Sequence, residues 1–131
     1  MKVTATVRNA PGAHETSVRT DAAERTLSLP GKAQGGCAVN GGELLMLAIA
    51  TCYCNDLYRE AAKLGIRIDR MEVEASAQFA DVGLAARDIA YRAKIESPDG
   101  PGAVAGLLRH TDAVAEVHNT IRAGVPVTLE D

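Results

Sequence analysis

Residues 40–54 read Asn-Gly-Gly-Glu-Leu-Leu-Met-Leu-Ala-Ile-Ala-Thr-Cys-Tyr-Cys, and this stretch decides the fold. Asn40 followed three residues later by Glu43 has the form of a capping box, which marks the start of a helix. From Leu44 to Cys54 the chain is apolar on nearly every helical face, so we expect this part to be buried on all sides. The helix then becomes amphipathic toward Gly65 and ends near solvent, with a polar face formed by Asp56, Arg59, Glu60 and Lys63.

Short strands with alternating apolar and polar residues flank this helix on both sides. The pattern predicts strands at residues 2–8, 14–20 and 25–29 before the helix, and at residues 71–79 and 89–95 after it. The last two form a predicted hairpin in which acidic side chains face basic ones, Glu72 and Glu74 against Lys94 and Arg92.

The C-terminal part of the chain predicts two short helices and a final strand. Apolar residues at helical spacing lie around 104–108 and again at 114–121, and Gly124 ends the second helix. Residues 125–129 read as an edge strand because they contain Pro126. This order of strands and helices is typical of an α+β fold with helices packed on antiparallel sheets.

Composition bounds the range of functions. The 131 residues fit a single domain spanning 1–131. A net charge of −3, with three Tyr, one Phe and no Trp, argues against nucleic-acid binding, and no apolar stretch is long enough to span a membrane. The chain opens directly into an alternating pattern, so no signal peptide is expected. Three cysteines are too few for a disulfide scaffold, and we expect a cytoplasmic protein.

Cys52 is the candidate of greatest chemical interest, although a cysteine in an apolar helix is usually an inert core residue. The structural interpretation is therefore favoured from the residues alone, and it applies equally to Cys54. Cys37 lies in a glycine-rich loop and is expected to be more accessible. Neither a metal site nor a cofactor is expected, because zinc-ligand spacing and phosphate-binding glycine patterns are both absent.

Two motifs resemble those of the OsmC/Ohr family, the osmotically inducible protein C and organic hydroperoxide resistance proteins. The first is Asn-Gly-Gly-Glu-Leu-Leu at 40–45, continued by Ala-Thr-Cys at 50–52. The second is Ala-Glu-Val-His-Asn-Thr-Ile at 115–121, followed by Gly124 and Val125, which is similar to the family's Cys-Pro-Val-His-Asn-Thr-Leu segment. The order of strands and helices also matches along nearly the whole chain.

The resemblance implies an intertwined homodimer whose long central helices pack in the dimer core. It also implies thiol-dependent reduction of organic hydroperoxides, with Cys52 in the place of the family's peroxidatic cysteine. That cysteine attacks the peroxide as a thiolate and becomes a sulfenic acid, which a second cysteine resolves as a disulfide. A glutamate and an arginine of the family hold the thiolate and orient the substrate.

This chain departs from the family pattern at the partners of that cysteine. The resolving position falls on Ala115, and the glutamate position falls on Gly42, with Glu43 displaced by one residue. The arginine is most nearly matched by Lys32 in one branch of the family and by Arg19 in another. Capping explains Glu43 equally well, and solvated surface charge explains both Lys32 and Arg19.

Three hypotheses follow from these departures. In the first, the protein is a one-cysteine peroxidase for small hydrophobic hydroperoxides, using Cys52 and either an external thiol reductant or Cys37 as a substitute resolver. In the second, it is a catalytically degenerate module that binds a small apolar ligand at the dimer interface. In the third, the cysteines only pack, and function lies with an unknown partner. The first hypothesis predicts that Tyr53, Tyr58 and His118 line the pocket, although a core or surface role also explains each of them.

Overall fold

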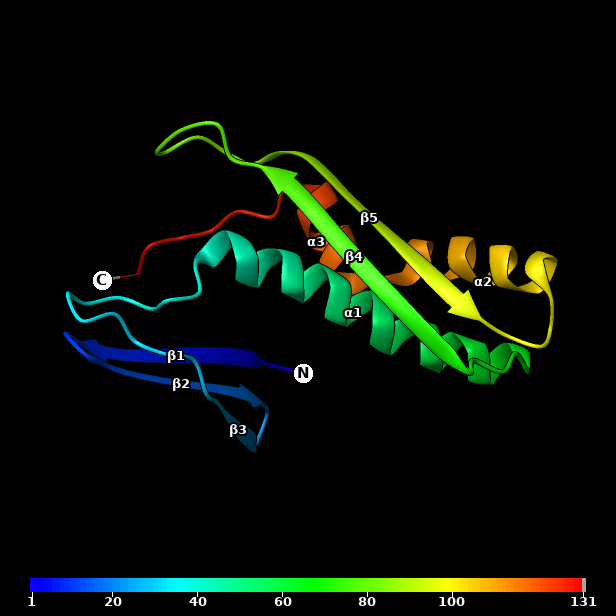
Figure 1. The fold of residues 1–131 in the computed structure, drawn as a ribbon, viewed down its shortest axis with the longest axis horizontal. Helices are drawn as coiled ribbons and strands as arrows, with labels where there is room; N and C mark the ends of the chain where they lie inside the picture. The colour runs from blue at the N-terminus through cyan, green and yellow to red at the C-terminus, as the bar shows by residue number, and fades with distance from the viewer. Residues whose placement is uncertain (131) are drawn as a thin grey trace. The chain divides into compact units, whose positions relative to one another are not determined.

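The computed structural model describes residues 1–130, and the chain divides into two compact units, Met1–Leu44 and the segment from Leu45 onward. Each unit contains its own antiparallel sheet, three-stranded in the first unit and two-stranded in the second (Figure 1). Mixed helices and antiparallel sheets confirm the predicted α+β class.

The first unit is a meander of β1 (Val3–Ala10), β2 (Ala13–Thr20) and β3 (Ala23–Leu27), paired in that order. The turn between β2 and β3 places Asp21 at a φ of 50°, and the Asp21 carboxylate accepts a hydrogen bond of 2.9 Å from the Lys2 backbone N–H. This tight turn pairs Thr20 with Ala23 and so fixes the register. For that reason β3 begins two residues earlier than the sequence predicts.

The long helix α1 (Gly41–Leu64) begins as the sequence predicts. The Glu43 backbone N–H donates to Asn40 Oδ1 at 2.7 Å, and the Asn40 N–H donates to Glu43 Oε1 at 3.0 Å, which is a reciprocal capping box. Within residues 1–130, no helix has both the length and the apolar character needed to cross a membrane.

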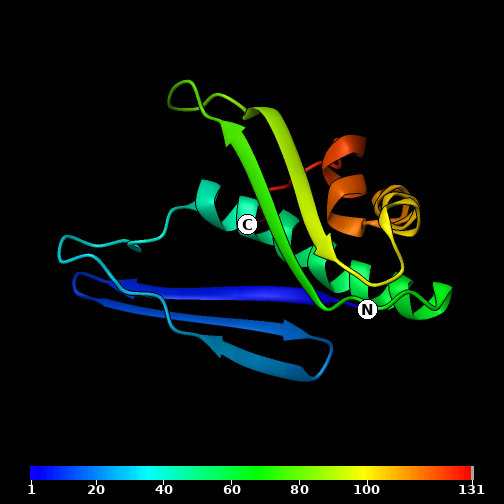
Figure 2. The same cartoon turned by 45° about the vertical axis from the view of Figure 1, so that its right-hand side comes forward.

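The second unit places the hairpin of β4 (Arg70–Gln78) and β5 (Arg87–Glu96) against α1 (Figure 2). The predicted cross-strand register is confirmed: Glu72 pairs with Lys94, and Glu74 pairs with Arg92. Apolar residues on the other side of the hairpin cover a buried cluster of Tyr53, Leu57, Ala61 and Leu107. The period-two alternation of the two strands therefore sorts their charged residues to solvent and their apolar residues to the core.

Two shorter helices complete this unit, α2 (Pro101–Val114) and α3 (Glu116–Ala123). The fully buried Ala115 separates them with an extended backbone, φ −75° and ψ 108°, which confirms two helices rather than one. Gly124 adopts the left-handed conformation, with φ 61°, and ends α3.

The structure corrects what the sequence predicts for two apolar segments, residues 125–129 and the first half of α1. Residues 125–129 form no strand in the described chain, and Val127 and Leu129 are 101% and 95% exposed. A strand needs a neighbouring strand to pair its backbone groups, and sequence alternation alone does not supply one. The first half of α1 is not buried on all sides either, because Leu47 is 59% exposed within this chain.

A third correction concerns the predicted polar face of α1. Asp56 and Glu60 are only 5% and 4% exposed, although both were expected near solvent. Glu60 is paired on every side: its oxygens lie 2.8 Å from Arg59 Nε, 2.9 Å from His110 Nε2 and 3.2 Å from Lys63 Nζ. These contacts, with Arg59 and then His110 contributing most, lower the pKa of Glu60 to about 2.

Acid should weaken this fold partly through Glu60. A carboxylate whose folded pKa lies below the ordinary 4.5 stabilises the fold above pH 4.5, and that contribution is lost as the pH falls toward about 2. The difference in free energy of unfolding between wild type and Glu60→Gln should therefore be largest near neutral pH and shrink in acid. Urea titrations across this pH range measure it, and a difference independent of pH would contradict the pairing.

Candidate functional site

Cys52 lies in the middle of α1, partly buried, with its sulfur toward the start of α3. The thiol donates to Asp56 Oδ2 at 3.5 Å, one helical turn further along α1, and lies 4.0 Å from Glu116 Oε2. The two carboxylates thus come from α1 itself and from the first residue of α3. Helical spacing explains the Asp56 contact. The extended residue Ala115 ends α2 and starts α3, and so places Glu116 near the Cys52 sulfur.

Arg59 joins the two carboxylates that surround the thiol. Its Nη1 lies 2.9 Å from Asp56 Oδ1 and 3.6 Å from Glu116 Oε1, while its Nε bonds Glu60. Arg59 occupies the same face of α1 as Cys52 because the two residues are seven apart, close to two helical turns. One guanidinium therefore organises every charged group that the structure places beside Cys52 in this unit.

The electrostatics around Cys52 favour a neutral thiol. Burial raises the pKa of the Cys52 thiol above its ordinary 9.0, the Val117 backbone N–H opposes that rise, and Asp56 and Glu116 add to it. Burial and the nearby Glu116 charge also raise the pKa of Asp56, against the lowering effect of Arg59. A carboxylate next to a protonated thiol can take up the thiol proton during an attack and return it to a basic leaving group.

The same three groups also have the spacing of a cation site. The Cys52 sulfur and one oxygen each from Asp56 and Glu116 lie within 4.8 Å of one another. Arg59 already pairs with both carboxylates, so a metal ion would have to compete with a resident positive charge. We therefore interpret the group as an ion-pair network around a thiol.

The other predicted catalytic residues, Glu43 among them, belong to the first unit. Glu43 caps α1, and its position nine residues before Cys52 corresponds to roughly 13 Å along the helix axis. Lys32, Arg19 and Cys37 all belong to the first unit, where Arg19 pairs with Thr4 and Glu24 in the sheet. Lys32 and Cys37 belong to one tight loop, in which the Lys32 N–H donates to the Gly36 carbonyl at 2.9 Å and Gly31 bridges to Cys37.

The three residues expected to line a pocket have different environments. Tyr53 is 3% exposed, and its hydroxyl donates to the Leu108 carbonyl at 2.6 Å. Tyr58 is 50% exposed on the outer side of α1. His118 is buried in α3 and borders a cavity, with its ring 4.4 Å from that of Tyr91 between centroids.

Sequence reasoning missed Asp56, Arg59 and Glu116 as partners of Cys52. Their helical spacing from Cys52 was a usable signal for Asp56 and Arg59, four and seven residues further on. Both were instead assigned to a solvated face, which is where charged residues of an amphipathic helix usually lie. Glu116 directly follows Ala115, the position that the family resemblance aligns with a resolving cysteine.

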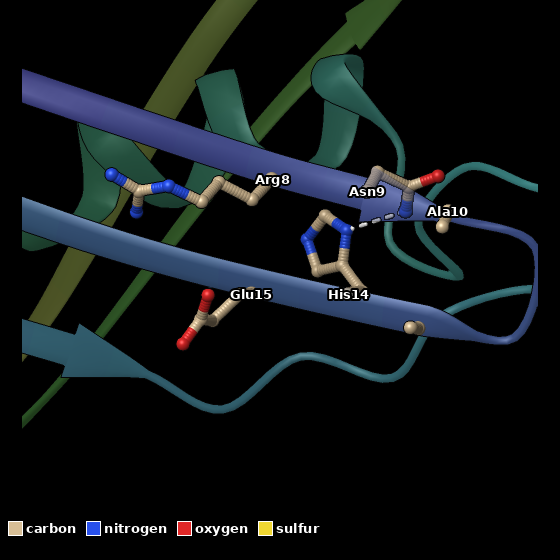
Figure 3. Close-up of a pocket in the computed structure, with 6 residues that line it drawn as sticks. Arg8, Asn9, Ala10, His14 and Glu15 are labelled. Carbon is tan, nitrogen blue, oxygen red and sulfur yellow. Dashed lines mark hydrogen bonds between the residues drawn. The ribbon is translucent and has the colours of Figure 1, made fainter.

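A surface hollow of about 410 Å³ lies on the β1–β2 hairpin of the first unit. Figure 3 shows His14 there to the right of Arg8 and Glu15, with its ring toward Asn9. Both nitrogens of His14 are engaged: Nδ1 lies 2.9 Å from Asn9 Nδ2, and Nε2 lies 2.7 Å from Thr16 Oγ1. The histidine therefore holds the end of the hairpin together.

A family model described as OsmC-like protein matches residues 31–130. No curated protein matches the chain. An organic hydroperoxide resistance protein OsmC from Legionella pneumophila is 20% identical, with a TM-score of 0.63, and the match covers 98% of this chain and 95% of that one. An OsmC-like protein from Mycoplasma pneumoniae is 19% identical, with a TM-score of 0.62 and coverage of 92% and 86%.

The organic hydroperoxide resistance protein OhrB of Bacillus subtilis is similar at the same level. It is 19% identical, with a TM-score of 0.55, and the match covers 99% of this chain and 97% of that one. At these identities the likeness to solved structures concerns the fold, while the family model spans most of the sequence and both motifs around Cys52 and His118.

Neutralising either carboxylate beside Cys52 should make the thiol easier to ionise. Asp56→Asn and Glu116→Gln each remove a negative charge that raises the pKa of Cys52, so both should speed alkylation of Cys52 several-fold at pH 8. Rates of iodoacetamide labelling, followed by peptide mass analysis, measure this. Unchanged or slower labelling in both variants would mean that the carboxylates do not control the thiol.

Proposed function

Because the chain belongs to the OsmC-like protein family, we propose that it reduces small hydrophobic organic hydroperoxides, with Cys52 as the nucleophile and an external thiol as the reductant. The observation that carries this proposal is the 3.5 Å contact between the Cys52 thiol and the Asp56 carboxylate, held in place by Arg59. Two of the solved structures that share the fold are named organic hydroperoxide resistance proteins.

Asp56 supplies what a thiol of raised pKa lacks, namely a local base. As the sulfur attacks the terminal peroxide oxygen, the S–H proton passes to Asp56 and the O–O bond breaks. The leaving alkoxide then takes that proton from Asp56 and departs as an alcohol. The terminal oxygen keeps its hydrogen, so Cys52 becomes a sulfenic acid and the carboxylate returns to its starting state.

An external thiol completes the cycle because the usual resolving position is Ala115. The first reductant thiol condenses with the sulfenic acid to form a mixed disulfide and water. A second thiol then releases Cys52 and leaves with the first as a disulfide. Cys37 is the alternative resolver within this chain, and it is a free thiol in the loop that precedes α1.

We further propose that the protein is a cytoplasmic homodimer in which the second copy covers the apolar first half of α1. Support comes from Leu47, which is 59% exposed in the middle of the apolar stretch, and from the exposed tail residues Val127 and Leu129. A contiguous exposed apolar patch marks an interaction site, and we propose that Leu47 belongs to one.

A catalytically degenerate binding module in the same fold is the second candidate function. The raised pKa of Cys52 favours it, because reactive cysteines normally have lowered pKa values. Under this alternative a small apolar ligand binds at the dimer interface, Cys52→Ser leaves its binding intact, and no peroxide is consumed.

Stoichiometric organic hydroperoxide should oxidise Cys52 to a sulfenic acid. Intact-mass analysis with dimedone present should show one trapped adduct on wild type and none on Cys52→Ser. A loss of two hydrogens that depends on Cys37 would assign resolution to that residue. An unmodified wild-type protein would overturn the peroxidase and favour the binding module.

Asp56→Asn separates the two roles of Asp56, which are to accept the thiol proton and to raise the thiol pKa by its negative charge. It should slow hydroperoxide oxidation of Cys52 by about 100-fold, because the departing alkoxide takes its proton from Asp56, although it speeds alkylation, in which iodide departs without a proton. Glu116→Gln is the matched control, because it removes the same charge and leaves the proton acceptor in place. Faster oxidation in both variants would exclude Asp56 as the base.

The dimer has its own test. Sedimentation equilibrium should give the mass of two chains for wild type, and Leu47→Glu should weaken the association because it places a charge in the covered helix face. Leu64→Glu, at a 51% exposed position near the other end of α1, is the control and should leave the mass unchanged. A monomeric wild type would contradict the proposal.

A further inference from the structure

A second hollow in the first unit, of about 170 Å³, is lined by polar side chains. It lies on one face of the β1–β2–β3 sheet, because strand residues two apart point to the same side and the apolar Val3, Val7 and Val18 take the alternate positions. Arg19, which the family resemblance suggested as a catalytic cation, borders this hollow. The full lining comprises Thr4, Thr6, Arg8, Ser17, Arg19 and Glu24.

Two guanidinium groups border this one space without being neutralised. No residue of 1–130 forms an ion pair with Arg8 or Arg19, although Glu15 and Glu24 lie directly across the strands from them. Figure 3 shows the Arg8 side chain extended along the sheet toward the start of β1, away from His14. Like charges that border one hollow repel each other, and an anion between them removes that repulsion.

The sheet register places hydroxyl groups between the two arginines. Thr6 pairs with Ser17, and this pair lies midway along the strands between the positions of Arg8 and Arg19. Guanidinium groups and hydroxyls can all donate hydrogen bonds, and a guanidinium fork matches two oxygens of an oxyanion. An ion of five heavy atoms fits the hollow, since one water takes up about 30 Å³. The hollow therefore offers the charge, the donors and the space for a tetrahedral oxyanion.

Glu24 determines which oxyanion suits the hollow. It lies directly across from Arg19 and is the carboxylate of the lining. A carboxylate accepts hydrogen bonds and repels an anion that has no proton to donate. Phosphate keeps at least one proton near neutral pH, so a phosphate O–H can donate to Glu24, whereas sulfate has no such proton.

We propose that this hollow binds inorganic phosphate in a protonated form, with the phosphate between Arg8 and Arg19 and its O–H donated to Glu24. Thr6 and Ser17 donate to the remaining oxygens. The whole site belongs to the first unit, so the proposal does not depend on the reduction of hydroperoxides at Cys52.

Phosphate, sulfate and methyl phosphate are matched probes for this proposal. At about pH 8 all three are tetrahedral dianions, and phosphate alone keeps a proton. Titrated into wild type at constant ionic strength, phosphate should shift the backbone amide signals of β1, β2 and β3. It should also bind about 10-fold more tightly than either of the other two, as one charge-assisted hydrogen bond provides.

Three variants assign the binding to this hollow. Arg19→Gln should weaken phosphate binding about 10-fold. Arg25→Gln is the matched control and should leave phosphate binding unchanged, because Arg25 pairs with Val18 and so lies on the opposite face of the same sheet. Glu24→Gln should abolish the preference for phosphate by strengthening sulfate binding, because the repelling charge is gone.

The wild-type titrations decide the question even if a variant fails to fold. Absence of phosphate binding to wild type, or equal affinity for phosphate and sulfate, would overturn the proposal. An equal loss of affinity in Arg19→Gln and Arg25→Gln would also overturn it, because phosphate would then respond only to the net charge of the protein.

Discussion

The second unit depends on the ion pairs that the Arg59 guanidinium makes with carboxylates of α1 and α3. Two carboxylates of helix α1, Asp56 and Glu60, are only 5% and 4% exposed. Burying a charge in this way destabilises the fold unless the charge is paired. Arg59 pairs with both of them and with Glu116 of α3, and Glu60 also pairs with His110 of α2. Arg59 thereby compensates the buried charge and ties the long helix to α3, while Glu60 ties it to α2.

The same arrangement sets the chemistry available to Cys52. Reactive cysteines usually sit near cations or helix N-termini, which stabilise a thiolate. Here the sulfur lies in mid-helix, 3.5 Å and 4.0 Å from two carboxylate oxygens, and Arg59 bridges the two carboxylates. Ionisation in advance of reaction is therefore disfavoured, and proton transfer to Asp56 during the attack becomes the productive route. The charge pattern that opposes a free thiolate is also the one that provides its base.

Local sequence patterns predicted the parts of the fold that depend on local physics. The capping box at Asn40 and Glu43 was readable because it needs only four consecutive residues, and the register of Glu72 with Lys94 because it needs only two strands that follow each other in the chain. The strand expected at 125–129 and the burial of Leu47 were wrong for this chain, since both need a surface that the chain does not supply. Asp56 was misassigned because it lies against Glu116 of α3, and the helical pattern of α1 alone does not encode that contact.

Direct titration of the Cys52 thiol is the sharpest test of the Arg59 network. The ultraviolet absorbance of the thiolate, taken as the difference between wild type and Cys52→Ser across the pH range, follows that single group. We expect Cys52 to ionise above the ordinary pKa of 9.0, because burial and two carboxylates oppose the charge. Ionisation at or below neutral pH would mean that Arg59 or another cation stabilises the thiolate directly, and would contradict the role assigned to Asp56.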